Sequence, residues 1–318
     1  MQEVSVIIPN FNGMAYLEGV FSSLEKQTVS DFEVILVDNG SADGSCAFTA
    51  SHYPWVHIIE LPENFGFCRA VNEGIRAAKA PYVLLLNNDT EVSNNFVEEM
   101  AAAIRRHKKA FSCSARMIQF HDREYLDDAG NYYCALGWAF ARGKGKPVNT
   151  YEKEEKIFSS CAGAAIYRKK IFEKIGYFDE EHFAYLEDMD IGYRARISGY
   201  ENWYAPKAIV YHVGSGTSGS RYNQFKTRYS SRNNIYLIYK NMPFVQIILN
   251  LPFLVIGFGI KLFFFAVKGL GREYAAGIKN GFQISKKEKK VRFSMANLPF
   301  YLKIQLELWG NMFRRFVS

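Results

Sequence analysis

Short apolar runs alternate along the first third of the chain with longer segments whose apolar residues recur every three or four positions. Residues 4–9, 32–38, 56–61 and 82–86 are rich in Val, Ile and Leu, and each run ends in a polar loop. Runs of this length and composition predict buried strands. Between the first two, residues 14–27 show the apolar spacing of an amphipathic helix. We therefore predict an α/β protein with a mostly parallel central sheet flanked by helices.

The same patterns continue to about residue 212. They predict helices at 66–78, 93–107 and 184–198, and a strand at 110–120. Residues 121–155 show no clear period and contain four glycines, so we expect a long substrate loop there. Residues 213–220 are dominated by Gly and Ser, which predicts a flexible loop.

The C-terminal part is apolar in a different way. Residues 243–267 are strongly apolar, yet Gln246, Asn250, Pro252 and Lys261 interrupt them. The charge-free stretch 242–260 is near the lower limit of roughly 17–25 residues for a membrane-spanning helix. A spanning helix, a shallowly embedded element and a pair of core helices all remain open.

The net charge of +7 is concentrated in this C-terminal part. Residues 240–318 hold 13 Lys and Arg against 3 Asp and Glu, whereas the preceding residues are slightly acidic. Basic residues interleaved with Phe, Leu and Trp favour an anionic membrane surface and argue against nucleic acid as a partner. We therefore expect two parts, a catalytic domain at 1–239 and a helical, membrane-associated region at 240–318.

Two further features bear on location. The five cysteines are scattered and never form a Cys-x-x-Cys pair, which is typical of a reducing compartment. The N-terminus lacks the basic and apolar regions of a signal peptide. The expected location is the cytoplasmic face of the cell membrane, peripheral or shallowly embedded. No pattern bears on the oligomeric state.

Polar residues follow three of the predicted strands. Asn10, Asp38 and Asp89 stand at strand ends, where open parallel sheets bind ligands. Asp89, in Asn87-Asn88-Asp89-Thr90, is suited to Mg²⁺ or Mn²⁺ held together with substrate phosphates. Asp38 is suited to the edge of a uracil- or thymine-like base. The alternative for Asp38 is a plain Asx turn, and for the segment around Asp89 a turn with an N-cap for the following helix.

Three carboxylates, Glu187, Asp188 and Asp190, stand near the start of a predicted helix. Asp188 is the candidate general base for an acceptor hydroxyl. The alternative is that all three are first-turn acids that complement the helix dipole, with Asp190 paired to Arg194 four residues on.

His212 lies between a strand-like run and the Gly/Ser loop. It is suited to binding a metal as neutral imidazole, or a phosphate as a charged donor, although a lone histidine is more often structural. Arg221, Arg228 and Arg232 follow and are candidates to close over a diphosphate, with solvated side chains as the default for the first two.

Taken together, these segments resemble the family 2 glycosyltransferases of the GT-A fold, and within them the rhamnosyltransferase-like and galactofuranosyltransferase-like group. The matching pieces, in the family's order, are 5–12, 37–44, 63–72, 86–90, 163–164, 187–194 and 212–215. Each piece is weak alone, but the ordered set is specific and covers about residues 3–235.

The resemblance implies roles for individual residues. Asp188 would be the base for direct displacement with inversion, and Asp89 and His212 would bind Mg²⁺ or Mn²⁺ and the diphosphate. The nucleotide-sugar donor would contact Pro9, Asn10, Asn12, Asp38, Asn39, Ser41, Asn64, Gly66, Arg69, Asn72, Asn87, Asn88, Gly163, Glu187 and Arg232. One departure is that Asn87 stands where the family's Asp-x-Asp has its first aspartate, so weaker metal binding is expected.

The resemblance also suggests substrates. dTDP-rhamnose is the first expectation for the donor and a UDP-sugar the second. The apolar, basic C-terminus favours a glycan acceptor on a polyprenyl lipid, for cell-surface polysaccharide assembly. The alternatives are a non-catalytic sugar-nucleotide-binding or scaffolding protein and, less favoured, a sugar-phosphate nucleotidyltransferase, because residues 10–13 supply no cation after the first strand.

Overall fold

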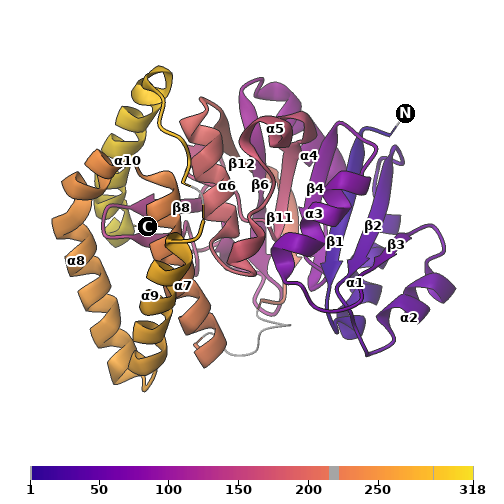
Figure 1. Ribbon diagram of the computed structural model, residues 1–318. Coiled ribbons are helices and arrows are strands. Elements are labelled where there is room, and N and C mark those ends of the chain that lie inside the picture. Colours follow the sequence, from indigo (N-terminus) through magenta and orange to yellow (C-terminus); the bar gives the residue numbers. More distant parts are fainter. Residues whose placement is uncertain (1, 215–221, 289, 318) are drawn as a thin grey trace.

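The predicted strand–helix–strand units are present in the computed structural model, which describes residues 2–214, 222–288 and 290–317 (Figure 1). The strands are β1 (Val4–Asn10), β2 (Phe32–Asp38), β3 (His57–Glu60), β4 (Tyr82–Leu86), β5 (Thr90–Val92), β6 (Ala110–Gln119), β7 (Leu126–Asp128), β8 (Asn131–Cys134), β9 (Trp138–Ala141), β10 (Glu155–Ile157), β11 (Ala164–Arg168) and β12 (Glu201–His212). The helices are α1 (Met14–Glu25), α2 (Ser45–His52), α3 (Phe67–Ala77), α4 (Phe96–Arg106), α5 (Lys169–Ile175), α6 (Glu187–Ile197), α7 (Gln224–Asn241), α8 (Phe244–Val267), α9 (Gly271–Ser285) and α10 (Leu298–Val317), with short 3₁₀ turns at Glu180–His182 and Met295–Asn297.

Ten of the strands form one twisted sheet in the order β10-β12-β6-β11-β4-β1-β2-β3, with β5 beside β12 and β7 beside β6. The strands β3, β2, β1 and β4 run parallel to one another, as β12 does to β6. β11 is antiparallel to both of its neighbours. The predicted fold class, α/β with a mostly parallel sheet, is confirmed.

Helices cover both faces of the sheet, and the strand sequences explain why. Within β1, Val4, Val6 and Ile8 pack into the core under α1 and α4, whereas Ile7 packs on the opposite face under α3 and α5. Because both faces are buried, the strands read as continuous apolar runs instead of alternating patterns. The carboxyl ends of β1, β2 and β4 consequently meet at one edge of the sheet.

The segment 121–155 differs from the expected long loop. It contains β7, the β8–β9 hairpin and the start of β10. These strands are three or four residues long, too short for a period of two to stand out in the sequence. β7 and β10 join the main sheet, whereas β8 and β9 form a separate two-stranded sheet. The segment is therefore ordered, and the prediction of a loop was wrong.

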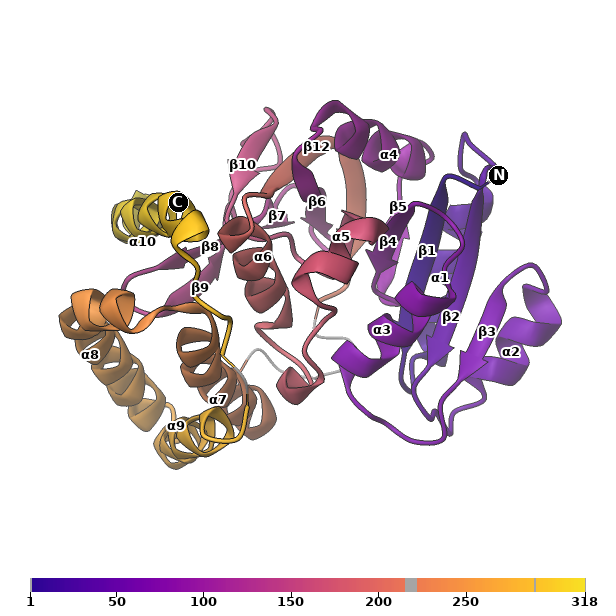
Figure 2. The same ribbon diagram turned by 45° about the horizontal axis from the view of Figure 1, so that its top comes forward.

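The helices α7 to α10 form a layer beside one end of the sheet, against β8 and β9 (Figure 2). Their core is shared with α6, because Met189 and Tyr193 of α6 pack in the same cluster as Leu237 and Leu254. α9 lies unusually close to α7: a Cβ on Gly277 would lie 1.9 Å from Ser231 Oγ. The layer therefore shares a hydrophobic core with the helix α6 that packs on the sheet, instead of standing apart.

Among the described residues, α8 is long and apolar enough to cross a membrane by length and composition, with a mean hydropathy of 2.2. Only 17% of that window is buried inside the protein. Its polar residues Gln246 and Asn250 face inward and are buried, while Phe244, Phe263 and Val267 lie on its exposed side. The expected domain boundary at 239/240 falls inside α7. The division into domains at this point stays a prediction.

Candidate active site

A relay of amide and carboxylate side chains links the ends of three parallel strands. Asn10 donates from Nδ2 to Asp38 Oδ1 at 2.8 Å and accepts on Oδ1 from Asn88 Nδ2 at 2.7 Å. All three side chains are buried. Such groups persist in a protein interior only when they are hydrogen-bonded, so the relay fixes the relative positions of the three strand ends.

Two loops extend this relay. Ser41 Oγ accepts from the backbone N–H of Asn12, and the Asn12 side chain accepts in return from the N–H of Ala42. Asn39 donates to Asn64 Oδ1 at 2.9 Å and to the carbonyl of Gly66. The predicted nucleoside-binding residues at these positions thus form one connected cluster. Pro9 lies in β1 beside it, and Gly163 accepts from the N–H of Asn87 at the end of β4.

A histidine stands between two aspartates where β12 ends. His212 Nδ1 is 2.8 Å from Asp127 Oδ2, and its Nε2 is 3.4 Å from Asp89 Oδ1. Pairing of β5 with β12 and a hydrogen bond from the N–H of Val213 to the carbonyl of Asp89 hold the two residues together. The predicted pair, Asp89 and His212, is therefore adjacent in space, and Asp127 is an additional partner.

The charges in this group are mutually dependent. Burial lowers the pKa of His212, but hydrogen bonds and charges of Asp127 and Asp89 outweigh it and raise the pKa to about 9. Burial acts against ionisation of Asp127, yet His212 and Lys144 bring its pKa down to about 2. At neutral pH His212 is thus an imidazolium beside the ionised Asp127. A metal that binds Nε2 must displace its proton.

The donor set suits a divalent cation. The separation of 3.4 Å between Asp89 Oδ1 and His212 Nε2 exceeds that of a good hydrogen bond. Two adjacent ligands on one Mg²⁺ or Mn²⁺ lie about 3 Å apart, so a small inward shift brings both atoms to ligand positions. The hydrogen bond from Nδ1 to Asp127 orients the ring as carboxylates commonly do for metal-binding histidines. The residues present therefore fit a cation together with donor phosphates.

The candidate base Asp188 lies in the first turn of α6. Its Oδ2 accepts from Asn131 Nδ2 at 3.0 Å, and its Oδ1 from the N–H of Met189. Burial raises the pKa of Asp188. For Glu187, burial and then the charge of Asp188 raise the pKa, and its Oε2 is buried without a hydrogen-bond partner among the described residues. Both carboxyl groups thus have a raised pKa, and perturbed pKa values of this kind are typical of functional sites.

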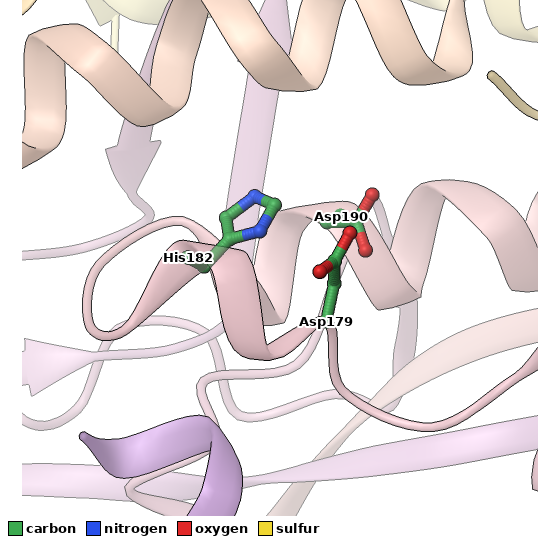
Figure 3. A group of neighbouring side chains, drawn as sticks. All are labelled: Asp179, His182 and Asp190. Carbon is green, nitrogen blue, oxygen red and sulfur yellow. The ribbon is translucent and has the colours of Figure 1, made fainter. Parts of the chain in front are cut away.

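A second group of possible ligands lies behind the base. Asp179, His182 and Asp190 place ligand atoms within 4.8 Å of one another (Figure 3). However, Lys240 pairs with both aspartates, and Arg194 pairs with Asp190 at 2.8 Å. These two cations already neutralise the carboxylates, so the group fits a buried ion network better than a metal site. The alternative for Asp190, a structural pair with Arg194, is present in the structure.

The loop that leads into the base is strained and held by α7. Phe183, Tyr185 and Leu186 all have positive φ, at 59°, 72° and 65°. Such conformations cost about 1 to 3 kcal/mol each and persist where surrounding contacts compensate. Asn233 supplies those contacts: its buried Nδ2 donates at 2.8 Å to the carbonyls of His182, Ala184 and Tyr185. The position of Asp188 therefore depends on α7.

Three residues predicted to contact the nucleotide-sugar donor bind other parts of the protein instead. Asn72 is buried and uses its amide for Phe178 and Glu180. Arg69 pairs with Glu73 and Glu180 on the surface. Arg232 donates to the carbonyl of Glu181 and lies over the ring of Tyr229. These three residues brace the loop before α6 instead of joining the relay. Arg221 and the stretch 215–220 lie outside the described residues.

Sequence reasoning missed three residues here. Asp127 and Asn131 lie in the segment expected to be a loop, and Asn233 lies 45 residues beyond the base it supports. Asp127 and His212 are 85 positions apart, so no local spacing connects them. The adjacent acids Asp127-Asp128 before Ala129-Gly130 were the available signal in that segment.

Comparison with known proteins agrees with this architecture. Residues 5–176, more than half of the chain, match the family model described as glycosyl transferase family 2. An N-acetylglucosaminyl-diphospho-decaprenol L-rhamnosyltransferase of Mycobacterium tuberculosis is 26% identical over 240 residues, which cover 67% of this chain and 77% of the relative. An uncharacterized glycosyltransferase of Bacillus subtilis, YwdF, is 25% identical over 73% of this chain and 85% of its own length.

Solved structures show the same fold. S. aureus TarS in complex with UDP-GlcNAc superposes with a TM-score of 0.54 at 18% identity, over 95% of this chain and 79% of that protein. GalNAc-T7 with UDP, GalNAc and Mn²⁺ gives a TM-score of 0.60 at 16% identity; this chain spans 48% of its length. Both likenesses show the GT-A arrangement of the sheet. On these grounds the chain belongs to glycosyl transferase family 2 and is a glycosyltransferase.

Proposed function

We propose that this glycosyltransferase transfers a sugar, with inversion, from a nucleoside-diphosphate donor to a hydroxyl of a lipid-linked glycan. The observation that carries the proposal is the arrangement of three groups of polar residues around one edge of the sheet. The relay of Asn10, Asp38 and Asn88 lies at the strand ends, with Asp89 and His212 beside it and Asp188 in the adjoining first turn of α6.

Each residue performs a separate task in this proposal. Asp38 and Asn39 bind the nucleoside, while Asn10 holds Asp38 in place. Asp188 accepts the proton of the acceptor hydroxyl as its oxygen attacks the anomeric carbon, which is the work of a general base. Asn131 donates to Asp188 Oδ2 and fixes the orientation of the carboxylate. Direct displacement by that hydroxyl inverts the anomeric configuration.

Asp89 and His212 would hold the cation, Mg²⁺ or Mn²⁺. When bound, the ion supplies Lewis-acid stabilisation of the charge that develops on the departing diphosphate. The aspartate missing at position 87 is offset in part by Asp127, which adds a carboxylate behind the histidine. Asp127, a residue outside the motif, therefore compensates in part for the weaker metal affinity expected from Asn87.

Asp127→Asn tests this role of the second carboxylate. Loss of an outer carboxylate that orients a metal-binding histidine lowers metal affinity about 10- to 100-fold. We expect that loss for Mn²⁺, measured by calorimetry in the presence of a nucleoside diphosphate. The matched control is Asp128→Asn, because Asp128 accepts from the N–H of Gly130 and its amide analogue retains that bond. Equal Mn²⁺ affinity for Asp127→Asn and the unaltered protein would contradict the assignment.

The pH dependence of transfer follows from the base. Burial raises the pKa of Asp188 to about 6, and the residue accepts a proton only when ionised. The rate of transfer under saturating substrates should therefore fall as the pH decreases through about 6. Initial rates across a pH series, with Mn²⁺ binding measured at each pH, separate this effect from loss of the metal. A rate that is constant down to the ordinary aspartate pKa of 3.8 would contradict it.

A donor panel tests the proposal as a whole. The relative from Mycobacterium tuberculosis is named as an L-rhamnosyltransferase, which supports dTDP-rhamnose as the first donor to try, with UDP-sugars second. Binding to the folded state raises the melting temperature by mass action. We expect one donor class, with Mn²⁺ present, to raise it and to be consumed when acceptor is added. Binding without transfer to any acceptor would favour a sugar-nucleotide-binding protein instead.

The acceptor and location are proposed from the C-terminal layer. α8 exposes Phe244, Val245, Phe263 and Val267, each at least 70% accessible, and the C-terminal region is strongly basic. An apolar helix face with flanking cations suits the surface of an anionic bilayer. A sugar on a polyprenyl diphosphate would be presented there. We accordingly propose that the protein acts on the cytoplasmic face of the membrane.

A further inference from the structure

An aromatic surface adjoins the candidate base. Phe183 and Tyr185, in the strained loop before α6, contact the ring of Phe225 with centroid separations of 6.3 and 6.1 Å. Phe225 in turn contacts Tyr229 at 4.5 Å. Phe225 is 44% exposed, so the first turn of α7 presents an accessible aromatic side chain next to the loop that precedes Asp188.

The aromatic residues continue toward the apolar face of α8. Tyr222, just before α7, contacts Phe264 and Phe265 near the end of α8 at 5.6 and 6.2 Å. Beside them, Phe263 and Val267 are exposed. Figure 1 shows the start of α7 and the turn between α8 and α9 at the same end of the molecule. We call Phe183, Tyr185, Tyr222, Phe225 and Phe264 the aromatic strip. It joins the surroundings of the base to the apolar surface.

Two lysines lie beside this strip. Lys226 follows Phe225 in the first turn of α7, and Lys144 contacts Asp127 Oδ1 at 2.5 Å. The pKa of Lys226 is lowered by its burial and also by the charge of Lys144, so the two ammonium groups interact. Lys144 is paired with Asp127, and the positive charge of the two lysines favours a phosphate group beside the strip.

We propose that the aromatic strip and the two lysines form a subsite for the lipid diphosphate of the acceptor, with its hydrocarbon chain along the rings. The inference rests on the proposed lipid-linked acceptor. The charges and the apolar surface lie in the order that such a molecule requires: phosphates near Lys144 and Lys226, then the chain from Phe225 toward α8. A free sugar or a soluble glycan would use neither part.

Kinetics with two acceptors test the subsite. Both carry the same sugar diphosphate, one on a long polyprenyl chain and one on a short, water-soluble alkyl chain, and both are presented to the full chain in one detergent. Burying a phenylalanine side chain corresponds to about a tenfold change in affinity. We expect Phe225→Ser to raise KM for the long-chain acceptor about tenfold, with little change for the short one. Phe225→Leu should retain most of the affinity.

Controls separate the possible outcomes. Trp55→Ser removes an aromatic of similar exposure, 42%, near β3 and should leave both KM values unchanged. Lys226→Gln should raise KM for both acceptors and leave the donor KM unchanged. If Phe225→Ser affects both acceptors equally, or neither, the subsite is refuted while the proposed function stands. If the unaltered protein transfers sugar to soluble acceptors but to no lipid diphosphate, both the lipid-linked acceptor and the subsite are refuted.

Discussion

Asp188→Asn should reduce the rate of sugar transfer about 10²- to 10⁴-fold, the contribution typical of a positioned general base. The amide retains an acceptor for the N–H of Met189 but takes up no proton at neutral pH. Initial rates with saturating donor, Mn²⁺ and acceptor measure the effect. Donor binding, followed by the shift in melting temperature, should remain, because the relay at the strand ends is untouched.

Stability provides the control for this variant. The raised pKa of Asp188 means that its charged form is disfavoured in the folded state, so a neutral amide there should not lower the melting temperature. Glu187→Gln serves as the neighbouring variant, since it removes the other carboxyl of the pair. If Asp188→Asn transferred sugar at the full rate, the base would have to be assigned elsewhere, with Glu187 the next candidate.

Asp190→Asn, two residues further on, should lower the stability of the fold, unlike Asp188→Asn. Asp190 is fully buried and pairs with Arg194 and Lys240, while Asn241 donates to its other oxygen at 2.8 Å. Breaking a buried ion network leaves cations incompletely compensated, which costs about 3 to 5 kcal/mol. We expect the free energy of unfolding, measured with denaturant, to fall by this amount.

Two comparisons sharpen this second prediction. Glu3→Gln breaks the exposed pair with Arg105 and should cost less than about 1 kcal/mol. Burial opposes the ionisation of Asp190, but Arg194 and Lys240 hold its pKa below the ordinary value. Its stabilising contribution is therefore present at neutral pH and is lost on acidification, so the difference between variant and unaltered protein should shrink at low pH. A constant difference would mean that its charge is not what stabilises the fold.

The fold was largely predictable because its signals are local. The runs at β1, β2 and β4 are continuous and apolar, so both their type and their boundaries were foreseen to within a residue or two. The strands β7 to β10 were missed because each is only three or four residues long, too short for a period of two to stand out. β10 also pairs with the distant β12, and β7 packs on the edge of the main sheet beside β6, contacts that no local pattern records.

The candidate site was predictable in part for a related reason. Asn10, Asp38 and Asp89 stand at strand ends, and the topology of a parallel sheet brings such ends together. Asp127 and Asn233 reach the site through tertiary packing of segments far apart in sequence. Among the three acids of residues 187–190, the sequence did not distinguish a base from a structural ion pair. Burial and the cations Arg194 and Lys240 make that distinction.

The position of α7 affects how shortened versions of the protein should be interpreted. The change in composition near residue 240 suggests cutting the chain after residue 239. That cut would remove Lys240 and Asn241, and Asp190, in the helix that carries the base, would lose two of its partners. Such a fragment would lose activity for reasons unrelated to any lipid. Its failure could easily be mistaken for a membrane requirement, whereas surface substitutions on α8 would test that requirement without disturbing the reaction centre.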